Sequence, residues 1–149
     1  MARFVRWILG LIAAALATYV VGTALNSQAV IAMHDISVSL GDRLNMTLFD
    51  LSNMVAYLAI IAVALLIGFL IATLLKRFLP NLARVAYPIA GAAAIAVTLG
   101  AMYMVFQTIP ISGERSTIGF LSQMFAGAIG GWVFARIAAK PVTPAKAGV

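Results

Sequence analysis

The chain has 149 residues, of which 64% are hydrophobic and only 9% are charged, and its mean hydropathy is +1.08. A soluble domain would carry about 25% charged residues, so this composition excludes a protein whose surface faces mainly water. The sequence contains no cysteine and one histidine, which excludes disulfides, thiolate catalysis, cysteine-ligated metal clusters and bis-histidine haem sites.

Four apolar stretches are each long enough to cross a membrane, and they cover residues 4–25, 51–75, 85–106 and 118–139. A hydrocarbon core of about 30 Å needs roughly 20 residues of helix, and no stretch has a charge in its central portion. The stretches are apolar on all sides, which favours helices over the alternating strands of a barrel. The predicted fold is an all-α membrane protein: a single four-transmembrane-helix bundle over residues 1–139, followed by a flexible cytoplasmic tail over 140–149.

The basic residues are distributed unevenly between the two sides of such a bundle. Eight of the ten fall at or before the start of the first stretch, between the second and third, or at or after the end of the fourth. These residues are Arg3, Arg6, Lys76, Arg77, Arg84, Arg136, Lys140 and Lys146. The positive-inside rule therefore predicts a multi-pass protein of the cell inner (plasma) membrane with both termini in the cytoplasm, N-in and C-in. This arrangement accounts for the net charge of +6, so nucleic acid is not expected as a partner.

Small residues recur at intervals of four along the predicted helices. The fourth helix carries Gly119, Gln123, Gly127 and Gly131, and the first carries Gly10, Ala14, Thr18 and Gly22. Faces of this kind, including Gly-x-x-x-Gly, let helix backbones approach closely. Two interpretations stay open: the faces pack on one another within one bundle, or the fourth helix forms a homo-oligomer or joins a larger membrane complex.

Gln123 interrupts the glycine series of the fourth helix with a polar side chain. A buried amide needs hydrogen-bond partners, and we expect one among Thr23, Tyr57 and Tyr103. The alternative is that Gln123 lines a polar path through the membrane.

The first extracytoplasmic loop has a helical pattern of its own. Ile36, Leu40, Leu44 and Leu48 recur every four residues, which predicts a short amphipathic helix in the outer headgroup layer. A β-hairpin turning at residues 41–42 is the alternative, but it would set Leu40 opposite Arg43 and mismatch the two faces. Thr47 and Asp50 have the spacing of a capping box that would start the second membrane helix near Leu48, and Ser39 and Asp42 have the same spacing.

The outer side also carries the candidate chemical residues, which are His34, Asp35, Asp50 and Glu114. One histidine and three carboxylates are the minimum for a hard metal ion or for acid–base chemistry. No second histidine or paired metal-binding motif supports such a site. We therefore interpret Asp42 and Asp50 as helix caps and His34 as an exposed loop residue, and we assign no catalytic residue, metal or cofactor.

Three classes of function remain. The favoured one is an accessory, assembly or scaffold subunit without catalytic activity of its own, because the chain lacks charge within the membrane but has faces suited to helix contact. The alternatives are a small oligomeric transporter or channel, and a membrane enzyme or lipid-handling protein that uses the outer acidic residues. Membrane lipids are expected partners in each case.

Overall fold

The computed structural model describes residues 2–34, 37–83, 85–108 and 115–138. Their secondary structure is helical: α1 (Ala2–Met33), α2 (Leu40–Asn53), α3 (Val55–Leu75), the 3-10 turn η1 (Pro80–Leu82), α4 (Ala86–Phe106) and α5 (Thr117–Ala138). Four of these helices, α1, α3, α4 and α5, are long and apolar enough to cross a membrane. The expected all-α architecture with four apolar spans is confirmed, and the predicted tail over 140–149 lies outside the described residues.

Helix α1 is longer than predicted. The expected end near residue 25 is wrong, because the helix continues through the polar residues Asn26, Ser27 and Gln28 to Met33. Asn26 and Ser27 are buried, and the Ser27 hydroxyl lies 3.0 Å from the Thr23 carbonyl oxygen. The polarity of this segment predicts a loop. In the structure its side chains form hydrogen bonds within the protein, so the helix continues through it.

The loop between the first two spans contains helix α2, so the hairpin alternative is wrong. Ser39 caps α2, since its hydroxyl accepts a hydrogen bond from the Asp42 backbone N–H at 3.2 Å. The second expected capping box does not form, because Thr47 lies inside α2 and donates to the Arg43 carbonyl oxygen at 3.0 Å. The second membrane helix therefore begins at Val55 rather than near Leu48.

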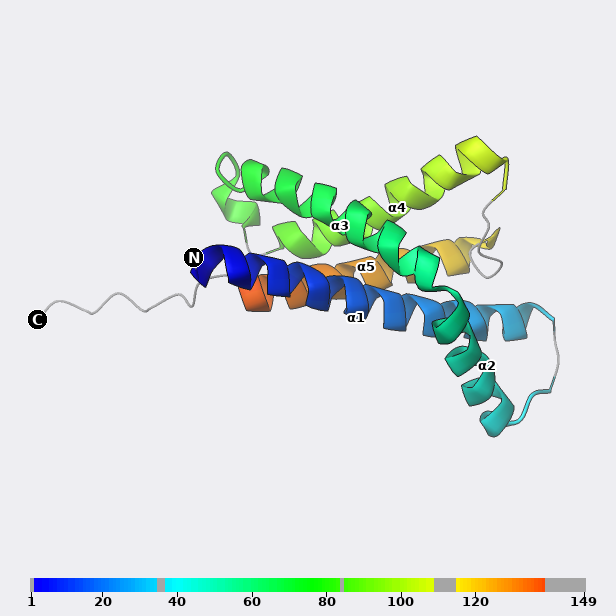
Figure 1. Ribbon diagram of the computed structural model, residues 1–149. Helices are drawn as coiled ribbons and strands as arrows, with labels where there is room; N and C mark the ends of the chain where they lie inside the picture. The colour runs from blue at the N-terminus through cyan, green and yellow to red at the C-terminus, as the bar shows by residue number, and fades with distance from the viewer. Residues whose placement is uncertain (1, 35–36, 84, 109–114, 139–149) are drawn as a thin grey trace, which may run out of the picture.

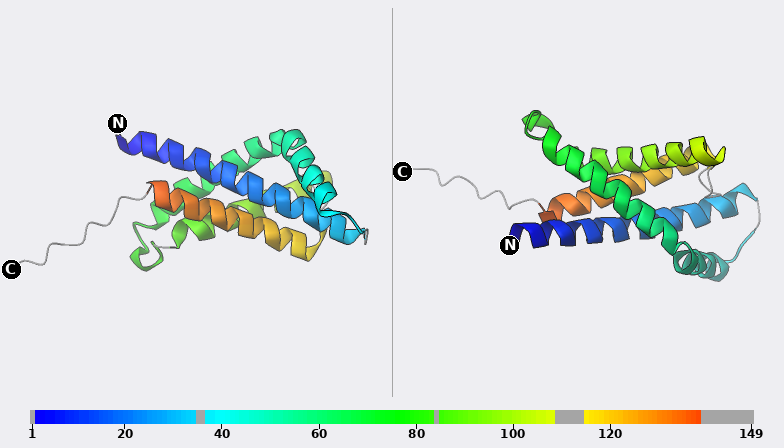
Figure 2. Two further views of the ribbon diagram at one scale, coloured as in Figure 1. Left: turned by 90° about the horizontal axis from the view of Figure 1, so that it is seen from below. Right: turned by 45° about the horizontal axis from the view of Figure 1, so that its top comes forward.

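The four long helices alternate in direction, and α5 makes its most extensive contacts with α1 and α4. Helix α3 packs on α4 and crosses α1 (Figure 1). The N-terminus, the connection from α3 to α4 and the end of α5 lie at one end of the bundle (Figure 1, Figure 2). We call this the basic end, because the described residues there include Arg3, Arg6, Lys76, Arg77 and Arg136. The opposite end, which carries α2, is called the α2 end.

Small residues bring the helices of the bundle close together. A side chain at Gly127 would collide with the Gly91 backbone, and one at Gly131 would collide with the Tyr87 backbone. On the other side of α5, a side chain at Gly130 would meet Thr18 of α1. Helix α5 is therefore in backbone contact with α4 along one side and packs tightly on α1 along the other.

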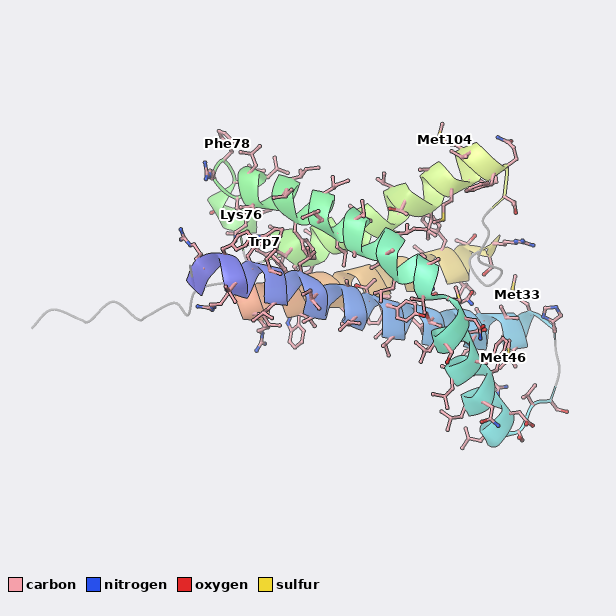
Figure 3. All side chains as sticks on the ribbon, in the orientation of Figure 1. Trp7, Met33, Met46, Lys76, Phe78 and Met104 are labelled. Carbon is pink, nitrogen blue, oxygen red and sulfur yellow. The ribbon has the colours of Figure 1, made fainter. Side chains whose placement is uncertain are left out.

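Four aromatic rings fill the core toward the basic end. Phe69 and Phe134 stack with ring centroids 4.3 Å apart, while Trp7 and Tyr87 meet Phe134 edge-on at 5.3 and 4.7 Å. Edge-to-face and offset rings at these separations are favourable packing geometries. Figure 3 shows Trp7 and Lys76 at this same end.

Candidate functional site

The residues proposed as an outer acidic site are not gathered in the described part of the chain. His34 is exposed at the end of α1, with its ring Nδ1 atom 2.8 Å from the Val30 carbonyl oxygen. Asp50 lies on α2 and contacts α1 at Ser27, which is about 10 Å along the helix from His34. Asp35 and Glu114 lie outside the described residues. Among the described residues, no group of three or more metal-ligating side chains could hold a metal ion.

Asp50 joins α2 to α1 instead of capping a helix, so the predicted capping role is wrong. Its Oδ2 atom accepts a hydrogen bond from the Ser27 hydroxyl at 2.6 Å. Tyr19 of α1 donates to the Leu51 carbonyl oxygen next in the chain, also at 2.6 Å. The two bonds attach the C-terminal part of α2 to the buried side of α1.

A second polar contact lies nearer the start of α2. Arg43 donates from Nη1 to the Gln28 Oε1 atom at 2.9 Å, and Gln28 donates from Nε2 to the Thr47 hydroxyl at 3.3 Å. These side chains, together with Ser27 and Asp50, connect α1 and α2 through hydrogen bonds. Helix α2 is thereby held across the direction of α1 (Figure 1).

Gln123 connects three helices. Its amide donates from Nε2 to the Gly22 carbonyl oxygen of α1 at 2.8 Å, and its Oε1 atom accepts from the Tyr57 hydroxyl of α3 at 3.4 Å. The expected bond to Tyr57 is confirmed, whereas Tyr103 is exposed on α4. Both ends of the amide are therefore engaged in helix contact.

The outer surface has a groove between α3 and α4, which we call the α3–α4 groove. Its half nearer the basic end is a cavity of about 380 Å³. The residues that line this basic half are Ala64, Ile67, Gly68, Ile71, Ala72, Leu75, Lys76, Leu79, Leu82, Ala86, Ile89, Ala90, Ala93, Ala94, Val97 and Thr98. Lys76 is the one charged side chain among these described lining residues, and it lies at the end of the groove.

The half of the groove nearer the α2 end is wider, with a volume of about 570 Å³. We call it the open half, and it is lined by Ala59, Ile60, Val63, Ala64, Ile67, Val97, Thr98, Ala101, Met102, Val105 and Phe106. Helix α4 diverges from α3 here (Figure 1, Figure 2). Four lining residues are shared with the basic half, so the groove is continuous along the two helices.

The end of α4 beside the open half has little contact with the other described residues. Tyr103, Met104, Val105 and Phe106 are 55, 77, 73 and 61% exposed. Four consecutive residues cover every side of a helical turn, so this turn is uncovered all round. Met104 points away from the bundle (Figure 3).

The groove was not predicted from the sequence. Small residues on the second and third apolar stretches indicate helix contact, but a stretch that is apolar on all sides gives no sign of which side stays uncovered. Among the described residues, the groove offers an apolar binding surface with the ammonium group of Lys76 at its end. Comparisons with protein-family models, with curated proteins and with solved structures found no match to this chain.

Proposed function

We propose that this protein is a non-catalytic accessory subunit of the plasma membrane, which binds a transmembrane helix of a partner protein in the open half of the α3–α4 groove. The observation that carries the proposal is the last turn of α4, whose four residues are exposed on every side beside an apolar groove. Helices within membranes associate mainly through close packing, and small residues such as Ala59 and Ala101 allow that approach.

The width of the open half fits the side chains of a helix. Its 570 Å³ extend over roughly 13 Å of α4, so the average cross-section of the open half is about twice that of the basic half. The described residues of its lining include no charged side chain, and their one hydroxyl group, on Thr98, is already bonded to the Ala94 carbonyl oxygen at 2.8 Å. An apolar helix is the partner that this chemistry favours.

The proposed orientation places the basic end in the cytoplasm. Arg3, Arg6, Lys76, Arg77 and Arg136 belong to this end, and the acids Asp42 and Asp50 belong to α2. The positive-inside rule supports N-in and C-in on this basis. Helix α2 would then lie in the outer headgroup layer, with Leu40, Leu44 and Leu48 exposed on one face.

A role as an ion channel or proton-coupled transporter has less support. The central portions of the four spans carry no Asp, Glu, Lys, Arg or His, and ion pathways through membranes usually need such residues. The glycine face of α5, which the sequence offers for an oligomer, is engaged by α1 and α4. An oligomer through α5 would have to use its exposed residues, such as Leu121, Phe125 and Trp132.

Site-specific photocrosslinking in native membranes tests the proposal. A photoreactive residue replacing Ala101, in the open half, is expected to give a covalent adduct with a different membrane protein. The matched control is the same replacement at Ile12, which is exposed on α1 away from the groove and should give no protein adduct. Adducts of Ala101 with lipid alone would overturn the proposal, and so would adducts with a second copy of this chain.

A further inference from the structure

We infer that the basic half of the α3–α4 groove binds an anionic phospholipid, with one acyl chain along the groove and the phosphate on Lys76. This inference uses the basic half alone, and it depends on the chain spanning a membrane but not on a protein partner in the open half.

The length of the basic half matches one leaflet of a bilayer. On α3 the lining runs from Ala64 to Lys76, and on α4 it runs from Ala86 to Thr98. Each segment rises about 18 Å, and half of a hydrocarbon core is about 15 Å thick. A lipid whose headgroup lies at Lys76 would therefore reach the bilayer midplane at the far end of this half.

The cross-section of the basic half favours an acyl chain over a helix. Its volume of about 380 Å³ extends over about 18 Å, so its average cross-section is about half that of the open half. A helix with its side chains is about 10 Å across, whereas a single extended hydrocarbon chain is much narrower and fits this half better. Small residues such as Gly68, Ala90 and Ala93 form the floor and walls, so the chain would contact the helices closely.

Lys76 supplies a fixed positive charge at the end of the groove. Its Nζ atom lies 4.4 Å from the centroid of the Tyr87 ring, a cation–π contact that orients the ammonium group. The Tyr87 hydroxyl is itself 3.1 Å from the Thr73 hydroxyl, which holds the ring in place.

No acid of this chain neutralises that charge among the described residues. The two described acids, Asp42 and Asp50, both lie on α2 at the opposite end of the bundle. An ammonium group has three donors and binds phosphate as a point charge. A basic residue between membrane helices on the cytoplasmic side is the environment that recognises anionic lipid headgroups.

Native mass spectrometry of the full chain in mild detergent tests the inference with two added lipids of identical acyl chains, phosphatidylglycerol and phosphatidylcholine. We expect phosphatidylglycerol to bind about fivefold more tightly than phosphatidylcholine, because the attraction between one lysine near a membrane surface and one negative lipid charge corresponds to about this ratio. Lys76→Gln should abolish this preference, and Lys76→Arg should keep it. Arg136→Gln is the matched control, because Arg136 lies at the same end over the Trp132 ring and does not line the groove.

A second variant tests whether an acyl chain occupies the basic half of the groove. Ala93 is exposed and lines the groove, so Ala93→Trp should fill the groove without entering the core. Binding of both lipids should then fall while the thermal stability stays that of the wild type. Equal affinity for the two lipids, an unchanged preference in Lys76→Gln, an equal loss in Arg136→Gln, or unchanged binding in Ala93→Trp would each overturn the inference.

Discussion

Buried polar side chains in this protein serve helix contact, and they do so in two ways. Gln123 and Ser27 make hydrogen bonds between helices. Thr18 and Thr23 are fully buried, and their hydroxyl oxygens have no hydrogen-bond partner among the described residues. The Thr18 hydroxyl occupies the space that a side chain at Gly130 would need, so its role is to fill the contact between α1 and α5. An unpaired buried hydroxyl costs free energy, which the close packing of the helices has to offset.

The contribution of Gln123 is testable by substitution. Gln123→Leu keeps the approximate volume but removes the bonds to Gly22 and Tyr57, and we expect it to destabilise the protein by about 1 kcal/mol. Reversible unfolding in detergent micelles measures the difference. Tyr57→Phe is the comparison variant, because it removes the hydroxyl that donates the 3.4 Å bond and keeps the shorter bond from Gln123 to Gly22. A Gln123→Leu variant as stable as the wild type would show that these bonds do not stabilise the bundle.

At the scale of elements, α4 and α5 are held by backbone contact at glycine. Gly131 and Gly100 provide a matched pair for testing this contact, since both are helical and the same methyl group can be added to each. A Cβ atom at Gly131 would collide with the Tyr87 backbone, whereas one at Gly100 would meet no heavy atom within 4 Å. We expect Gly131→Ala to lose about 1–3 kcal/mol through overpacking, and Gly100→Ala to be neutral or slightly stabilising. Thermal denaturation of the two variants side by side measures this, and equal stability would contradict the packing.

The elements also show where a local sequence signal is sufficient. The apolar stretches predicted the four spans, because length and hydropathy alone determine whether a helix can cross a membrane. Two capping boxes of equal spacing preceded the second span, yet only Ser39 caps a helix. The leucines that repeat every four residues from Leu40 continue past Thr47, so one helix covers both boxes and Thr47 bonds within it. A capping box spans only four residues, and the longer pattern of leucines determines the extent of this helix.

The candidate site could not be predicted in the same way. The sequence predicted a helix-capping role for Asp50. Its actual partner, Ser27, is far away in the sequence and lies on a segment that was predicted to be a loop. The α3–α4 groove depends on how two helices diverge in space, and helices that are apolar all round carry no periodic sign of their uncovered side. In the sequence, Lys76 indicates only the orientation of the chain in the membrane. Its contact with the Tyr87 ring joins two helices across a turn, and the sequence carries no sign of it.

For the whole molecule, the two ends of the bundle differ in charge, and this difference predicts the orientation in the membrane. The chain has no cysteine, so single substitutions provide unique labelling sites. Asn81 is exposed in η1 at the basic end, and Thr108 is exposed beyond the end of α4 at the opposite end. With the basic end in the cytoplasm, a maleimide that cannot cross the plasma membrane should label Thr108→Cys in intact cells. Asn81→Cys should react only after the membrane is permeabilised, and the cysteine-free wild type should not react at all.

Labelling of Asn81→Cys alone in intact cells would show that the protein has the opposite orientation. An anionic lipid would then reach Lys76 from the outer leaflet instead of the inner one. Equal labelling of both variants in intact cells would instead contradict a membrane between the two ends of the bundle.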